Sequence, residues 1–245
     1  MFPIGDEQNG RILRPVVNYT LIAINILVFL YQLTLPDTPR DPALQDFVFR
    51  WGAIPSEISN GRHLETLLTS MFMHGGWLHI GGNMLFLWVF GDNVEDAMGH
   101  VRYLLFYLLC GLAAGLAQVF IDASSTGPLV GASGAIAGVL GAYILLFPRG
   151  KIRTIVFLGF FVTVVLIPAW VQIGIWIVLQ FFNGVAGLGV HTEESGGVAY
   201  WAHIGGFIAG AVLVWLFRDQ QAVERQRAAR AGNQAWQRVG LTGGR

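Results

Sequence analysis

Residues 130–147 read VGASGAIAGVLGAYILLF, an apolar run that contains no charged residue and in which Ser133 follows Gly131-Ala132. Runs of roughly twenty apolar residues are long enough to cross a bilayer as a helix. Small side chains recur through the run, and they let a second helix approach the backbone closely. We therefore expect a transmembrane helix with a tightly packed face made by Gly131, Gly134, Ala135, Ala137, Gly138, Gly141 and Ala142.

The composition of the whole chain is typical of a membrane protein. Of its 245 residues, 54% are hydrophobic and only 12% are charged, whereas an ordinary soluble domain has about 25% charged residues. The mean hydropathy is +0.56. Apolar residues come in long blocks separated by short polar segments, which favours one all-α, polytopic bundle. A net charge of zero gives no attraction to nucleic acid, and the single cysteine, Cys110, permits no intrachain disulfide and no cysteine metal cluster.

Six apolar runs are candidates for transmembrane helices. They cover residues 16–35, 79–90 with an extension toward 94, 101–121, 130–147, 160–182 and 200–217. Pro168 falls within the long stretch 151–182, which we interpret as a short interfacial piece, 152–159, followed by a span kinked near the proline. The long first loop, 36–76, is too apolar for a plain linker and carries Trp51, so we expect it to be partly embedded in the membrane.

The basic residues predict an orientation for these spans, because loops rich in Lys and Arg stay on the cytoplasmic side. With both termini cytoplasmic, all Lys and Arg residues except Arg40, Arg50 and Arg62 fall inside. The chain then divides into a cytoplasmic N-terminal segment, 1–15, a membrane domain, 16–217, and a basic, partly disordered cytoplasmic tail, 218–245. No cleavage signature or transit peptide is visible, so we expect a retained first span in a multi-pass plasma-membrane protein.

Two polar residues lie at similar depth in this arrangement, Ser133 at the outer end of the fourth span and His203 near the outer end of the sixth. Polar residues are costly in a membrane and are candidate functional residues. Ser133 alone also fits helix packing, and a lone histidine is more often a structural donor. Gly206 and Gly210 form a small-residue face below His203, and docking this face on the fourth span would bring the imidazole to the hydroxyl. We therefore predict a nucleophile, Ser133, and its base, His203.

His79 and Asn83 are four residues apart and share one face of the second span. Both can donate hydrogen bonds to the oxyanion of a tetrahedral intermediate, and loss of one such donor costs about 2.7–4 kcal/mol of barrier. The alternative is a polar clamp between helices, worth about 1–2 kcal/mol. No Asp or Glu lies within the apolar cores, and Asp122 at the end of the third span is the nearest candidate orienter. We prefer a Ser-His dyad because a buried carboxylate is costly.

These motifs together resemble the rhomboid family of intramembrane serine proteases. Ser133 stands in a G-x-S-G setting, His203 precedes a G-x-x-x-G pattern, and His79 and Asn83 stand in HGGWLHIGGN at 74–83. The resemblance runs from the first span to the sixth and implies a six-helix fold. It also implies that Ser133 is the nucleophile, that His203 is the general base and then acid, and that His79 and Asn83 are oxyanion donors. The substrates would be single-pass transmembrane proteins, and no metal or cofactor would be needed.

The chain departs from the family pattern in its first loop. Many members carry a Trp-Arg pair ahead of a Thr-x-x-Phe segment, and the corresponding place here reads Glu65-Thr66. The motifs of the site are unaffected, so the departure concerns how this loop is held against the bundle. The span 160–182 lacks the glycine pattern of its neighbours, and we hypothesise that it is the side through which a substrate helix enters, with Trp170 and Trp176 restricting entry.

Three other functions fit parts of the sequence. A metalloprotease is disfavoured because no H-E-x-x-H motif occurs. A transporter or channel could use the same four polar residues as a conduit, but inverted repeats and paired broken helices are not recognisable. A catalytically inactive adaptor of the same fold would have no need of both Ser133 and His203. The sequence leaves the oligomeric state open.

Overall fold

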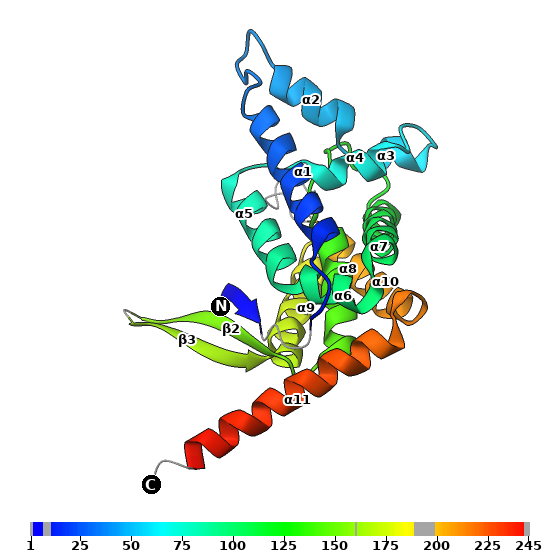
Figure 1. Ribbon diagram of the computed structural model, residues 1–245. Helices are drawn as coiled ribbons and strands as arrows, with labels where there is room; N and C mark the ends of the chain where they lie inside the picture. Colours follow the sequence, from blue (N-terminus) through cyan, green and yellow to red (C-terminus); the bar gives the residue numbers. More distant parts are fainter. Residues whose placement is uncertain (1, 7–10, 160, 189–198, 243–245) are drawn as a thin grey trace.

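Helices make up most of the structure, which is a computed structural model (Figure 1). It describes residues 2–6, 11–159, 161–188 and 199–242, with the backbone alone at 158 and 232–242. The elements in chain order are β1 (Phe2–Asp6), α1 (Val16–Gln32), α2 (Ala43–Trp51), α3 (Pro55–Ser59), α4 (Thr66–Thr69), η1 (Ser70–Phe72), α5 (Trp77–Phe86), η2 (Leu87–Gly91), α6 (Asp92–Met98), α7 (His100–Ile121), α8 (Ser133–Leu146), β2 (Lys151–Leu158), β3 (Phe161–Pro168), α9 (Ala169–Ala186), α10 (Tyr200–Phe217) and α11 (Gln220–Thr242).

Among the described residues, three helices are long and apolar enough to cross a membrane, namely α7, α9 and α10. Two further apolar helices, α1 and α8, are shorter. The second predicted span falls within α5, η2 and α6, which follow one another without a break from 77 to 98. The six expected spans therefore all coincide with helical segments over most of their length, and the count of six membrane crossings stays a prediction.

The small residues of α8 make it the centre of the bundle, where it contacts α5, α7, α9 and α10 (Figure 1). A side chain at Gly206 would collide with the backbone carbonyl of Gly134, and one at Gly210 with that of Gly138. The backbones of α8 and α10 therefore touch along two glycine faces, as small-residue patterns allow in membranes. The glycine packing expected from the sequence is confirmed.

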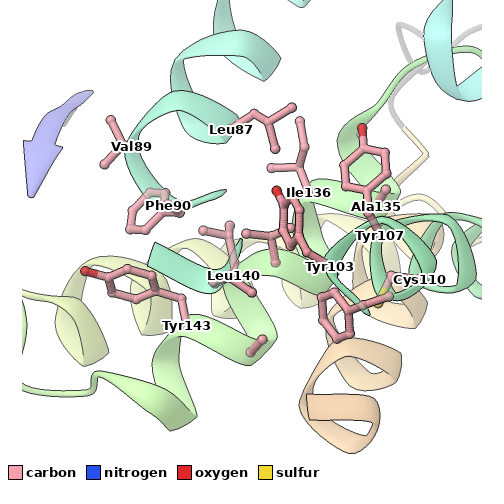
Figure 2. Close-up of a cluster of buried hydrophobic side chains, with 14 of the residues drawn as sticks. Leu87, Val89, Phe90, Tyr103, Tyr107, Cys110, Ala135, Ile136, Leu140 and Tyr143 are labelled. Carbon is pink, nitrogen blue, oxygen red and sulfur yellow. The ribbon is translucent and has the colours of Figure 1, made fainter. Parts of the chain in front are cut away.

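Large side chains from η2 and α7 pack against α8 along its length (Figure 2). Phe90 of η2 packs edge-on against Tyr143 of α8, with ring centroids 5.0 Å apart. Tyr103 and Tyr107 of α7 are fully buried in the same cluster. Buried aromatic rings contribute large contact areas and resist displacement, so this cluster fixes α8 between α7 and η2.

The structure corrects the all-α prediction between 151 and 168. The expected interfacial piece and the start of the expected fifth span instead form an antiparallel hairpin, β2–β3, and β1 pairs with the other edge of β2. The run is rich in Val, Ile, Thr and Phe, which favour strands, and Gly159 turns the chain with φ +62°. Pro168 precedes the first residue of α9, where its missing N–H costs no helical hydrogen bond. The predicted kinked helix is therefore wrong, and the fifth helix begins at Ala169.

The tail also differs from the partly disordered extension expected from its composition, because residues 220–242 form α11; residues 243–245 lie outside the described part of the chain. The side chain of Asp219 accepts the backbone N–H groups of Gln221 and Ala222, at 2.9 and 3.1 Å. An aspartate at this position is a favourable helix N-cap. A local capping signal thus starts a helix that composition alone did not indicate.

A buried polar cluster holds α11 to the N-terminal strand. Arg230 is buried, with 5% of the residue exposed, and its Nη2 lies 3.4 Å from Oδ2 of Asp6 and 2.6 Å from Oδ1 of Asn93. The Tyr143 hydroxyl donates to the same Asp6 oxygen at 2.6 Å. Burial raises the pKa of the Asp6 carboxyl, against the opposing effect of the Arg230 charge. The cluster therefore joins β1, α6, α8 and α11 at one end of the bundle.

The long first loop packs against α7 through α3 and α4, and α2 contacts α4. Ala53 forms a two-way backbone pair with Leu129, and Ile58 and Leu67 bury their side chains with Val119. Where the Trp-Arg pair of related sequences would stand, Glu65 is exposed, whereas the Thr66 hydroxyl donates to the His63 carbonyl at 2.6 Å. This loop is thus tied to α7 and to the segment before α8, and its embedding in the membrane stays a prediction.

Candidate active site

Ser133 is the first residue of α8, and the chain reaches it through a turn that only glycine adopts easily. Gly131 has φ +131°, and its backbone N–H donates to the Ser70 carbonyl at 2.9 Å. The first N–H groups of a helix lack intrahelical partners and carry a partial positive charge. The Ser133 hydroxyl therefore lies at the start of α8, where backbone N–H groups without helical partners gather.

His203 lies in the first turn of α10, directly beside Ser133. Its Nε2 atom is 2.7 Å from the Ser133 Oγ atom, a normal hydrogen-bond distance. The glycine faces of α8 and α10 bring these two helix starts together, because larger side chains would hold the backbones apart. The structure thus brings together the two residues that the sequence singled out first.

Gln180 of α9 holds the other side of the imidazole, and the sequence interpretation did not include it. Its Oε1 atom lies 2.7 Å from Nδ1 of His203, while its Nε2 donates to the Trp176 carbonyl at 3.4 Å. An amide oxygen can only accept, so Nδ1 carries the hydrogen and Nε2 is left to accept from the Ser133 hydroxyl. The Trp176 ring lies over His203, with centroids 5.7 Å apart. Gln180 could have been found from the sequence, because an amide inside an apolar helix marks a candidate site.

His79 and Asn83 of α5 face the turn that precedes Ser133. A β-carbon on Gly131 would lie 2.7 Å from Nε2 of His79 and 3.7 Å from Nδ2 of Asn83. The Gly75 N–H donates to Nδ1 of His79 at 3.3 Å, so the ring hydrogen of the neutral imidazole is on Nε2. Nδ2 of Asn83 is buried and has no hydrogen-bond partner among the described residues. Two N–H donors thus lie beside Gly131, two residues before Ser133, and that of Asn83 is unpaired in the described part of the chain.

A cavity of about 670 Å³ joins all four predicted residues. This volume lies within the range of about 300–1,000 Å³ that ligand sites usually have. Helices α5 and α8 and Trp176 of α9 contribute to the lining. Its apolar part includes Leu78, Phe86, Ile136, Leu140 and Trp176. An apolar, elongated guest would therefore contact mostly hydrocarbon while one end met the polar groups.

The described residues that line the cavity include no carboxylate. Asp122, the candidate orienter noted in the sequence, follows α7 in a loop, where it accepts a hydrogen bond from Ser124 at 3.4 Å. Gln180 occupies the orienting position beside the imidazole instead. A hydroxyl beside a correctly oriented base, with N–H donors nearby, is an arrangement that can carry out acyl transfer.

Comparison with known proteins agrees with the motifs. The profile of the Rhomboid domain matches residues 61–220. The chain is 30% identical over 218 residues to "Rhomboid protein 1, mitochondrial" of Saccharomyces cerevisiae, which covers 86% of the chain and 56% of that protein. It is 33% identical over 209 residues to "Rhomboid protease GluP" of Bacillus subtilis, and the match covers 84% of the chain and 36% of that protein. It is 31% identical over 152 residues to "Rhomboid-like protein 11, chloroplastic" of Arabidopsis thaliana, and the match covers 61% of the chain and 51% of that protein.

The chain thus spans about half the length of two of these relatives and about a third of the other. The matched domain contains all four residues predicted for the site, and Gln180 as well.

Proposed function

Because the chain belongs to the rhomboid family, we propose that it is an intramembrane serine endopeptidase that cleaves transmembrane proteins. The observation that carries the proposal is the 2.7 Å contact between Ser133 Oγ and His203 Nε2 inside the apolar bundle. A serine hydroxyl is a weak nucleophile until an adjacent base accepts its proton. This contact supplies that base, and a bundle without catalytic work would gain little from placing the pair here.

In the proposed reaction, Ser133 Oγ attacks the carbonyl carbon of the scissile peptide as His203 Nε2 takes the hydroxyl proton. His79 and Asn83 donate hydrogen bonds to the resulting oxyanion, with the Ser133 backbone N–H as a third donor. His203 then gives the proton to the leaving nitrogen as the C–N bond breaks. Water attacks the acyl-enzyme with the same base, which releases the carboxylate product and restores Ser133. Gln180 is a positioning residue that keeps Nε2 of His203 free to accept.

The substrate class follows from the apolar cavity and from the chemistry of helices. A transmembrane helix hides its peptide bonds in its own hydrogen bonds, so the enzyme must receive a locally unwound segment. We therefore expect single-pass membrane proteins with Gly or Pro near the outer boundary. Entry would occur between α5 and α9, which both contribute side chains to the lining of the cavity.

The proposed topology has six spans, with both termini cytoplasmic and Ser133 below the outer surface. The distribution of Lys and Arg supports this orientation. The membrane domain, 16–217, would carry the chemistry in the plasma membrane. The mitochondrial and chloroplastic locations in the names of two relatives belong to those proteins.

The test is labelling of the detergent-solubilised protein with a fluorophosphonate, which reacts with activated serines. We expect labelling of the wild type and of Ser124→Ala, an exposed loop control, and its loss in Ser133→Ala and His203→Ala. Labelling that persists in Ser133→Ala would overturn the assignment of the nucleophile. Solute flux in liposomes without labelling would identify a transporter. Absence of both labelling and flux would identify an inactive adaptor.

A further inference from the structure

The hairpin β2–β3 projects from the bundle at the end opposite Ser133. Helix α8 runs away from Ser133 and the chain then enters β2, so the hairpin begins where α8 ends. The two strands pair along their full length, from Lys151 with Pro168 to Leu158 with Phe161. Figure 1 shows the paired strands reaching sideways from the bundle, with their tip free of other elements. The hairpin is thus an extension of the membrane domain and not part of its core.

Both faces of the outer hairpin are apolar. Residues 155–167 include no Asp, Glu, Lys or Arg. Successive side chains of a strand point to opposite faces, and both Phe161 (79% exposed) and its neighbour Val162 (61% exposed) are open, as are Phe157, Val164 and Leu166. An antiparallel sheet that faces water on one side has polar residues there. Exposed strands in water also carry charges or prolines that block pairing. The outer hairpin carries no charge and one polar side chain, the exposed Thr163, and its single proline, Pro168, stands at the base of β3.

The apolar surface of the hairpin continues into α9. No Asp, Glu, Lys or Arg occurs between Arg153 and Glu193, so the hairpin and the helix that follows it form one uncharged stretch. Trp170, two residues beyond the end of β3, is 58% exposed, and Leu179 further along α9 is 52% exposed. Helix α9 meets the length and hydropathy of a membrane span. The solvent that suits its outer face, the lipid bilayer, therefore suits the adjoining hairpin too.

We propose that β2–β3 lies in the membrane interface as a lipid-embedded paddle at the foot of α9. Two features limit its depth. Strand β3 is an edge of the sheet, and its unpaired backbone groups need water or lipid headgroups, which the hydrocarbon core does not offer. The exposed Arg149 and Arg153 stand at the base of the hairpin, where phosphate groups of anionic lipids complement their charge. The occupant of this surface is the phospholipid leaflet, whatever reaction the outer site performs.

The test uses a polarity-sensitive fluorophore on single cysteines in the full chain. In a Cys110→Ala background, Val164→Cys reports on the hairpin, Leu179→Cys on the lipid-facing side of α9, and Gln221→Cys on an exposed site of α11. Each labelled protein is placed in vesicles of phosphatidylcholine and phosphatidylglycerol. Lipids with a nitroxide near the headgroup or deep in the acyl chain, and aqueous iodide, serve as quenchers.

We expect blue-shifted emission at position 164 and loss of its signal to the shallow nitroxide lipid, with weak quenching by iodide. Position 179 should respond to lipid quenchers and position 221 to iodide. Emission and iodide quenching at 164 equal to those at 221 would overturn the proposal. Protection of position 164 from the two nitroxide lipids and from iodide, together with cross-linking between copies, would also overturn it, because a second copy would then cover the hairpin.

Discussion

Gln180 of α9 and His203 of α10 face each other, with Oε1 of the amide 2.7 Å from Nδ1 of the imidazole. The contact makes α9 part of the site, because a shift of this helix removes the acceptor that fixes the ring hydrogen. If the substrate also enters beside α9, the hydrogen bond between Gln180 and His203 connects the helix at the entry path to the catalytic base. The state of the dyad would then depend on the position of the helix that admits the substrate.

Changing Gln180 tests this role. Gln180→Leu should lower kcat about tenfold, within the about 10–100-fold effect that loss of an orienting partner has elsewhere. Gln180→Glu should retain more activity, but the acid limb of its pH profile should move to higher pH, because a carboxylate stabilises the charged imidazolium. The measurement is the pH dependence of fluorophosphonate labelling and of substrate cleavage. Profiles identical to that of the wild type in both variants would exclude a positioning role.

Asn83 offers the sharpest test of the oxyanion site, because its buried Nδ2 has no partner among the described residues. Asn83→Ala should lower kcat about 10²–10³-fold, equivalent to about 2.7–4 kcal/mol, with little change in KM. Asn60→Ala, in an exposed loop, is the control. Steady-state kinetics on a transmembrane substrate and thermal unfolding separate the two roles of Asn83. A loss of stability with unchanged kcat would point to a polar clamp instead.

The glycine contact between α8 and α10 predicts a contrast between two alanine variants. Gly210→Ala places a methyl group against the carbonyl of Gly138, whereas Gly174→Ala on α9 meets open space. Overpacking costs about 1–3 kcal/mol, so Gly210→Ala should lower the midpoint of thermal unfolding and slow labelling of Ser133. Gly174→Ala should leave labelling unchanged and should not lower the midpoint, because alanine favours a helix more than glycine does. Equal unfolding midpoints and labelling rates in the two variants would mean that α8 and α10 can move apart without loss of stability.

The two tryptophans proposed to restrict entry occupy different surroundings. Trp176 lines the cavity and covers His203, whereas Trp170 is 58% exposed at the far end of α9. Trp176→Leu should raise cleavage of a membrane substrate severalfold by opening the α9 wall, and Trp170→Leu should leave it unchanged. The comparison uses initial rates in liposomes. Equal rates for both variants and the wild type would remove the tryptophans from the entry path.

The sequence predicted the positions that lie together at the site, because spacing on a helix and matching glycine faces are local properties. His79 and Asn83 share a face by their four-residue separation, and the glycines of α8 and α10 bring Ser133 to His203. Gln180 was missed although its polarity marked it, because nothing in the spacing links it to a histidine on another helix.

The hairpin was missed for a different reason. Long apolar runs do not show by periodicity alone whether they form a buried helix or a strand. The β-branched residues before Pro168 were the available signal, but the pairing of β1 with β2 depends on chain segments far apart in the sequence. The start of α11 likewise depends on the single capping side chain of Asp219, which an average over composition hides.

The buried pair of Asp6 and Arg230 holds strand β1 and helix α11 together. Removing one partner of a buried ion pair leaves an uncompensated charge at a cost of about 3–5 kcal/mol. A version shortened from the tail would leave Asp6 with only the neutral partners Tyr143 and Asn93. One shortened from the start would leave Arg230 with Asn93 and Tyr143 and without its carboxylate. Neither end can therefore be trimmed independently, and the stable unit of this protein extends beyond its membrane helices to both of the segments that fasten them.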